Sequence, residues 1–441
     1  MRTRRWAALT VASVSMGLVA ACGFGVDLDG LFGVQAGPTD GAPPDVVTDG
    51  TVEEDASIPK VQVVQLGAGS DFACARRVDG TVMCWGANGS EGRLGNGAFL
   101  ASSRPVLVSG LADAADLAVG ARHACVVRTA GTVACWGEND YRQLGDGTTN
   151  DARTPVPVLL LSDAKQVAAG SEFTCALRND GSVMCWGENA DGQLGDGTTT
   201  GRGQPAPVQG LTGATQIVAA SETACALVGG EVFCWGNNSV SQLGSGTPPN
   251  DSPTPVKVSD LSGVQSLHAG PNSDHFCAVA ASGEVRCWGY GQAGNLGNTK
   301  SEDSVTPVSV ITLTEAAGVA LGDDFSCAWR KSGSVMCWGT NSWRQLGVGD
   351  SSPPSGVSSP LAVNALSGVQ QIAAGNAFAC ALHGDGANIS CWGSNIAGSL
   401  GRSTTVYAPV PVKTASSATA AAIGLGRDHG CAADAQGALA C

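Results

Sequence analysis

Sixteen of the seventeen cysteines fall into eight pairs that recur along the chain. The members of a pair are nine to eleven residues apart, and the first members of successive pairs are 50 to 53 residues apart. A period near 50 indicates one supersecondary unit repeated eight times. The pairs are Cys74–Cys84, Cys125–Cys135, Cys175–Cys185, Cys225–Cys234, Cys277–Cys287, Cys327–Cys337, Cys380–Cys391 and Cys431–Cys441.

Each unit contains four short apolar runs separated by Gly, Asp and Pro, which is typical of β-strands. Three runs are clear within residues 165–195, and a Pro-Val-x-Val run precedes each later unit. This repeat predicts an all-β fold, a β-propeller of four-stranded blades, with seven or eight blades for the eight hairpin units. The first unit lacks a preceding Pro-Val-x-Val run, and we expect residues 45–60 to supply that strand.

A Cys-Trp-Gly triplet occurs seven times and is followed by forms of Asn-x-x-x-Gln-Leu-Gly, as at Asn139–Gly145 and Asn341–Gly347. Over residues 61–441 the chain resembles the regulator of chromosome condensation repeat family, in its cysteine-bearing bacterial lipoprotein form. The resemblance implies a propeller, usually of seven blades. The chain departs from the pattern in having eight hairpins and in lacking a Trp-Gly after Cys441.

The spacing within a pair suits a disulfide across one hairpin. A three-residue loop such as 78–80, with Gly in its last position, places Cys74 opposite Cys84. Directly opposed cysteines in a non-hydrogen-bonded pair are close enough to bond. We therefore predict eight disulfides within the hairpins. Free thiols packed between blades are the alternative, and zinc is less favoured because few units have a nearby His.

The first 21 residues are predicted to be a signal peptide. Arg2, Arg4 and Arg5 precede an apolar run that ends in Val-Ala-Ala before Cys22. This ending resembles a bacterial lipobox, which implies lipidation of Cys22; an ordinary signal peptide is the alternative. Residues 22–60 are expected to form a disordered tether and residues 61–441 the propeller. We expect an exported protein anchored by lipid to the cell envelope, with the outer membrane or cell surface favoured.

Charge and motif content narrow the function. The net charge is 24 − 38 = −14, which argues against nucleic-acid binding because phosphate contacts need clustered Lys and Arg. The chain contains no P-loop, Gly-x-Ser-x-Gly or His-Glu-x-x-His motif, so we predict no catalytic residues, no metal and no cofactor. His123, His275 and His429 occupy positions that hold Phe in other units, which favours a packing role.

Acidic residues recur three positions before the first cysteine of a unit. In a propeller, equivalent loop positions lie around one face, so we predict an incomplete acidic ring, interrupted by Arg122 and Ala377. The alternative is a set of solvated turn residues. If the ring does not bind a partner, the binding face is expected on the opposite side, among the Gln-Leu-Gly loops. The candidate binding rim is Asp71, Glu172, Glu222, Asp274, Asp324 and Asp428.

These features favour a non-enzymatic protein-binding or scaffold module that is monomeric and recognises a basic protein partner. It would contact the membrane only through its lipid. The alternative is a propeller enzyme, a lyase or hydrolase with its site on one face. A guanine-nucleotide exchange factor, by analogy with the family's nuclear namesake, is less favoured because an exported chain would not meet a cytosolic GTPase.

Overall fold

The structure is a computed structural model. It describes residues 63–69, 72–247, 250–270, 273–349, 355–383, 388–394, 407–413, 420–425, 430–434 and 439–440. All of them belong to one compact unit, Ile58–Cys441, which is described here by itself. Cys22 and residues 45–60 lie outside the described residues. Within the described residues, no helix is long and apolar enough to cross a membrane.

Seven four-stranded antiparallel sheets follow one another along the chain, and a three-stranded sheet ends it. Blade 1 is β1 (Val63–Ala68), β2 (Phe72–Arg77), β3 (Val82–Gly86) and β4 (Ser102–Leu107). Blade 2 is β5 (Ala114–Val119), β6 (His123–Arg128), β7 (Val133–Gly137) and β8 (Ala152–Pro157). Blade 3 is β9 (Ala164–Ala169), β10 (Phe173–Arg178), β11 (Val183–Gly187) and β12 (Arg202–Pro207). Blade 4 is β13 (Ala214–Ala219), β14 (Thr223–Val228), β15 (Glu231–Gly236) and β16 (Ser252–Lys257).

The remaining sheets follow the same order. Blade 5 is β17 (Val264–Ala269), β18 (His275–Ala280), β19 (Val285–Gly289) and β20 (Ser304–Ser309). Blade 6 is β21 (Ala316–Leu321), β22 (Phe325–Arg330), β23 (Val335–Gly339) and β24 (Val357–Ala362). Blade 7 is β25 (Val369–Ala374), β26 (Phe378–His383), β27 (Asn388–Ser394) and β28 (Tyr407–Lys413). The eighth sheet is β29 (Ala420–Leu425), β30 (Gly430–Asp434) and β31 (Leu439–Ala440).

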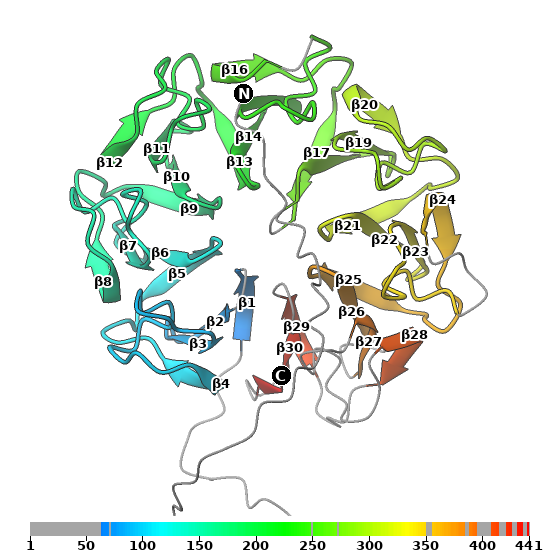
Figure 1. The fold of residues 1–441 in the computed structure, drawn as a ribbon, viewed down its shortest axis with the longest axis horizontal. Coiled ribbons are helices and arrows are strands. Elements are labelled where there is room, and N and C mark those ends of the chain that lie inside the picture. Colours follow the sequence, from blue (N-terminus) through cyan, green and yellow to red (C-terminus); the bar gives the residue numbers. More distant parts are fainter. Residues whose placement is uncertain are drawn as a thin grey trace, which may run out of the picture. The chain divides into compact units, whose positions relative to one another are not determined.

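The sheets stand around a common axis as a β-propeller, with the first strand of each innermost (Figure 1). The eighth sheet completes the ring, because β29 contacts both β25 and β1. The all-β propeller prediction is therefore confirmed, with seven complete blades and one three-stranded sheet among the described residues.

The Pro-Val-x-Val run was predicted to begin the next unit. It is instead the fourth and outermost strand of the blade whose other three strands come before it in the chain. Cys135 pairs with Val156, and Cys185 pairs with Ala206, across the third and fourth strands of one sheet. The outer strand of blade 1 is β4, so blade 1 has four strands without residues 45–60. The sheet that has three described strands is the last one.

The hairpin between the second and third strands has the predicted loop. In blade 3 the Arg178 N–H donates to Ser182 O (2.9 Å) and closes a three-residue loop, whose last residue, Gly181, has φ of 82°. Counting back from this hydrogen-bonded pair makes Cys175 and Cys185 a non-hydrogen-bonded pair. Their Cα atoms are 4.1 Å apart, and the sulfurs are bonded.

Neighbouring blades are joined through the Cys-Trp-Gly and Gln-Leu-Gly motifs. The indole N–H of Trp186 in blade 3 donates to the Gln143 carbonyl of blade 2 (2.9 Å). Gly145 follows with φ of 70°, and a Cβ there would lie 2.7 Å from the Trp186 indole nitrogen, so glycine is required. The six described tryptophans of this set are fully buried. Each motif thus serves the seam between two blades.

Glutamine side chains join the innermost strands. Gln166 Nε2 donates to Ile217 O (3.1 Å), and its Oε1 accepts from Ile217 N–H (3.0 Å). Gln216 makes the same pair of bonds to Leu267 in the next blade. These side chains extend backbone pairing across the gaps between sheets.

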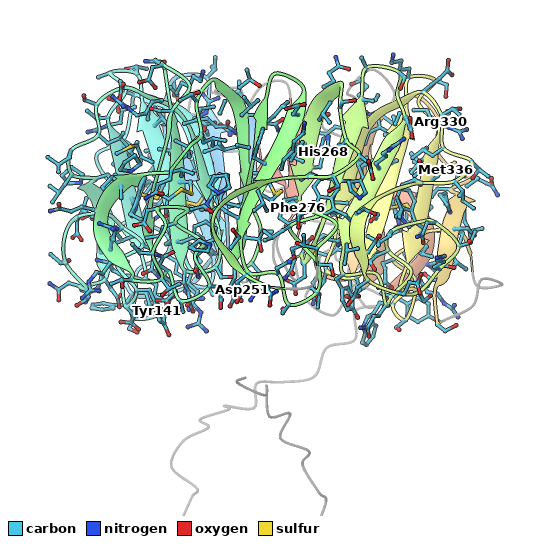
Figure 2. All side chains as sticks on the ribbon, turned by 90° about the horizontal axis from the view of Figure 1, so that it is seen from above. Tyr141, Asp251, His268, Phe276, Arg330 and Met336 are labelled. Atoms are coloured by element: carbon cyan, nitrogen blue, oxygen red, sulfur yellow. A yellow bond between two sulfur atoms is a disulfide. The ribbon has the colours of Figure 1, made fainter. Side chains whose placement is uncertain are left out.

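The propeller has two faces that differ in the chain segments they present. We call the "loop face" the one that carries the turns between first and second strands. The "hairpin face" carries the loops between second and third strands and the linkers between blades. Tyr141 marks the loop face and Arg330 the hairpin face (Figure 2).

Candidate functional site

The described rim residues, Glu172, Glu222, Asp274 and Asp324, all occupy the turn between the first and second strands of their blades. Asp71 and Asp428 lie outside the described residues. The residue after Trp-Gly donates its N–H to a rim carbonyl, as from Glu188 to Glu172 (3.0 Å). The Asn-x-x-x-Gln-Leu-Gly loops therefore begin on the loop face too, and the expectation that they lie opposite the rim is wrong.

One group of carboxylates gathers on the loop face at blades 2 and 3, and we call Glu138, Asp140, Glu172 and Glu188 the first acidic patch. Burial raises the pKa of Glu172 above its ordinary value, and the negative charges of Glu138 and Glu188 add to this. The pKa of Tyr141, whose side chain is 43% exposed, is raised chiefly by Glu172. These shifts show that the carboxylates share one negative field.

Arg122 interrupts the rim but does not cancel the first acidic patch. Its Nη1 donates to Glu138 Oε1 (3.2 Å), and half of the Arg122 side chain is exposed. One guanidinium faces four carboxylates, so the local balance stays negative.

A second group lies at blades 5 and 6, and we call Asp274, Asp303, Asp323 and Asp324 the second acidic patch. Burial raises the pKa of Tyr290, and all four aspartates raise it further. Burial also raises the pKa of Asp324. Asp303 is held in place because its Oδ1 accepts the Gly291 N–H (3.0 Å). Within the described residues, no group of three or more His, Cys, Asp or Glu could hold a metal ion.

The rim was predicted only in outline. Glu138 and Glu188 belong to the first acidic patch and were missed, although a Cys-Trp-Gly-Glu-Asn sequence recurs at 135–139 and 185–189. The structure brings these side chains beside the rim because the loop after Trp-Gly pairs with the rim carbonyl. Counting positions from the first cysteine alone could not show that approach.

Two of the three histidines at the repeated position, His123 and His275, are described, and both lie inside the seams between blades. His123 Nε2 contacts Thr174 Oγ1 (2.8 Å), and His275 Nε2 contacts Ser326 Oγ (2.9 Å). Both hydroxyls donate onward to backbone carbonyls, so each accepts the imidazole N–H. Burial lowers the pKa of His123 to about 4 and that of His275 to about 3. They are neutral packing groups; His429 lies outside the described residues.

Six of the eight predicted disulfides are present in the described residues, each within one hairpin. Cys391 is also disulfide-bonded and stands opposite Cys380 in the ladder. Cys441 lies outside the described residues. Buried disulfides of this number are typical of proteins that fold in an oxidising compartment.

Comparison with known proteins agrees with this architecture. The chain is 30% identical over 171 residues to the ultraviolet-B receptor UVR8 of Arabidopsis thaliana, which covers 38% of each protein. It is 32% identical over 168 residues to the human probable E3 ubiquitin-protein ligase HERC6, which covers 36% of this chain and 16% of HERC6. The chain thus spans well under two thirds of either relative.

A solved structure of Prp20p from Saccharomyces cerevisiae, described with its binding to Gsp1p and histones, has the same fold. The TM-score is 0.65 at 19% identity, over 85% of this chain and 93% of Prp20p. The family model for the RCC1-like domain matches residues 6–273, and the model for the regulator of chromosome condensation (RCC1) repeat matches residues 282–329 and 332–382. The chain therefore belongs to the RCC1-like domain family of β-propellers.

Proposed function

We propose that this chain is a non-enzymatic, exported and lipid-anchored propeller that binds a basic protein partner through its loop face. The observation that carries the proposal is the pair of acidic patches, each beside a tyrosine, on one face of a rigid ring. Protein binding is common among RCC1-like propellers, and Prp20p is described as binding two kinds of protein.

The physical role of the patches is to attract and orient the partner. Fixed carboxylates on one face create a field that raises the rate of encounter with a positively charged surface. The patches lie on different blades, so a partner with two separated basic segments could engage both. Tyr141 offers an exposed aromatic surface beside the first acidic patch, and aromatic residues are frequent anchors at protein interfaces.

The cell-surface part of the proposal rests on different residues. The arginine-rich start and the Val-Ala-Ala-Cys ending at Cys22 support export and lipidation. The disulfides favour an oxidising compartment. A lipid on Cys22, followed by the tether, would hold the propeller near the membrane while leaving the loop face free to bind.

The test compares two variants with equal changes in charge. The rim variant is Glu172→Gln, Glu222→Gln and Asp324→Asn; the control on the hairpin face is Asp79→Asn, Asp180→Asn and Glu315→Gln. A peptide of alternating lysine and glycine serves as the probe, and association rates are measured over a range of salt concentrations. We expect the rim variant to associate more slowly and to show a weaker dependence on salt, because fewer charges remain to be screened over the Debye length of about 8 Å at physiological ionic strength.

The control variant should behave like the unmodified chain. Equal slowing in both variants would mean that only net charge matters and would contradict a binding role for the loop face. Association that is indifferent to salt and to the rim changes would also contradict it. Circular dichroism of each variant checks that the fold is retained.

A further inference from the structure

On the hairpin face of several blades, an arginine side chain of the hairpin donates hydrogen bonds to the linker that enters the blade. This arginine stands three residues after the first cysteine of the unit. In blade 2, Arg128 Nε donates to Asp113 Oδ1 (3.0 Å), and its Nη2 donates to the Gly110 carbonyl (3.1 Å). Asp113 and Gly110 belong to the linker that enters the blade. The guanidinium thus fills the space between hairpin and linker, and we call this space the arginine seat.

The arginine seat recurs in other blades, each of which repeats one of the two bonds of blade 2. In blade 3, Arg178 Nε donates to Asp163 Oδ1 (2.7 Å). In blade 6, Arg330 Nη2 donates to the Thr312 carbonyl (2.7 Å), the counterpart of the Gly110 carbonyl. The geometry of the repeat is therefore suited to hold a guanidinium at this point.

Blade 5 lacks the arginine of the seat, as do blade 4, which has Val228 there, and blade 7, which has His383. In blade 5 the position holds Ala280, and Gly263 replaces the linker aspartate. A hollow of about 360 Å³ remains between hairpin and linker. Its lining includes Leu261 and Ala278, which are buried and apolar, and a Cβ on Gly263 would meet no atom within 4 Å.

The polar part of the lining is negative. Two acidic residues, Glu284 and Asp260, and one basic residue, Arg286, line the hollow. Glu284 Oε1 accepts from Arg286 Nε (2.9 Å) and from Ser309 Oγ (2.9 Å), and these bonds lower the Glu284 pKa, so this carboxylate is ionised. Arg286 Nη1 donates to the Asp260 carbonyl (2.8 Å), the acceptor that an arginine at position 280 would use.

We infer that the hollow in blade 5 binds the guanidinium group of an arginine side chain presented by a partner polypeptide. The apolar floor suits the methylene stem of the arginine, and the Glu284 carboxylate suits its planar head. The site lies on the hairpin face, so it does not depend on the function proposed for the loop face. It would give a partner a defined point of attachment on blade 5.

The experiment follows the methyl NMR signals of Ala278 and Ala280 in the full-length, alanine-methyl-labelled chain. N-acetyl-arginine amide is the probe, and N-acetyl-citrulline amide, which is similar in shape but neutral, is its control. We expect saturable shifts of both methyl signals at millimolar arginine probe, and at least threefold weaker binding of citrulline. Glu284→Gln should weaken binding of the arginine probe about twofold to fivefold, because one exposed ion pair is lost.

The decisive variant places an arginine of the chain itself in the arginine seat of blade 5. Ala280→Arg with Gly263→Asp restores the residues of blade 2 and should abolish the shift of the Ala278 methyl signal. Val228→Arg puts the same residue at the equivalent position of blade 4 and should leave binding unchanged. The inference fails if the probe gives no saturable shift, or if the filled variant still binds. Tighter binding of free arginine than of the capped form would place a small molecule there and would also overturn it.

Discussion

At the scale of single residues, one repeated position holds Phe, His or, in blade 4, Thr223, and burial of the side chain decides its chemistry. His123 and Phe173 occupy the same place in blades 2 and 3, and both are fully buried. In blade 2 the imidazole adds one hydrogen bond, to Thr174, without becoming charged. The packing role could be predicted from the exchange of His for Phe. The Thr174 partner could not, because it belongs to the neighbouring blade.

Acid should destabilise the propeller through these histidines. The pKa of His123 is lowered to about 4 in the folded chain, from an ordinary value of 6.5. The unfolded chain therefore binds more protons between these values, and stability present above pH 6.5 is lost as the pH falls toward 4. At about 1.4 kcal/mol per pKa unit, His123 accounts for roughly 3 kcal/mol.

Urea unfolding at several pH values measures this dependence. His123→Phe, which copies blade 3, should flatten the decline in the free energy of unfolding between pH 6.5 and pH 4. His383→Phe is the control, since His383 is on blade 7 and contacts Ser390 within its own hairpin. An unchanged slope in the His123 variant would show that the imidazole is not held neutral.

At the scale of strands and hairpins, turn chemistry was predictable and strand membership was not. The three-residue loop closed by Gly181 follows from the glycine's position and the cysteine spacing. The two-residue loop Gly229–Gly230 in blade 4, with φ of 57° and 84°, follows from the shorter spacing between Cys225 and Cys234. The Pro-Val-x-Val strand was assigned to the following blade, but it pairs with the third strand of the preceding one. A long loop separates these two strands, and its sequence does not indicate the pairing.

Each hairpin disulfide should stabilise the fold by a few kcal/mol. The bond between Cys175 and Cys185 joins residues ten apart, and loop entropy then predicts roughly 2–3 kcal/mol. Replacing both cysteines by alanine should lower the free energy of unfolding by that amount under oxidising conditions. Under reducing conditions the variant and the unmodified chain should converge. A loss that persists in reductant would instead indicate damage to packing.

At the scale of the whole molecule, the chain combines a closed ring with a strong negative charge. Cleavage of the proposed signal peptide, which contains Arg2, Arg4 and Arg5, would change the charge from −14 to −14 − 3 = −17. The ring architecture could be predicted from the repeat. The two acidic patches and the hollow of blade 5 could not, because they depend on which loops approach each other and on the small residues Gly263 and Ala280.

Anchoring can be tested on the intact molecule. Cys22→Ser should move the protein from the membrane fraction to the soluble fraction, because the lipid would be the only hydrophobic attachment. Cell fractionation with immunodetection measures the distribution. Lys60→Ser, a change in the tether that spares the lipid site, is the control and should leave the protein with the membrane. A Cys22 variant that stays in the membrane fraction would contradict lipid anchoring.

The bond from each tryptophan to the preceding blade has an evolutionary consequence. Trp186 finds its acceptor at Gln143, and Trp235 finds the equivalent acceptor at Gln193. The same bond is made at six seams among the described residues, so a duplicated segment of about 50 residues would bring both halves of a new seam with it. Duplication or loss of one whole unit leaves every tryptophan N–H with its carbonyl acceptor. An insertion of half a unit would separate a tryptophan from its acceptor and leave both without a partner. Descendants of such a gene are therefore expected to differ in length by whole blades.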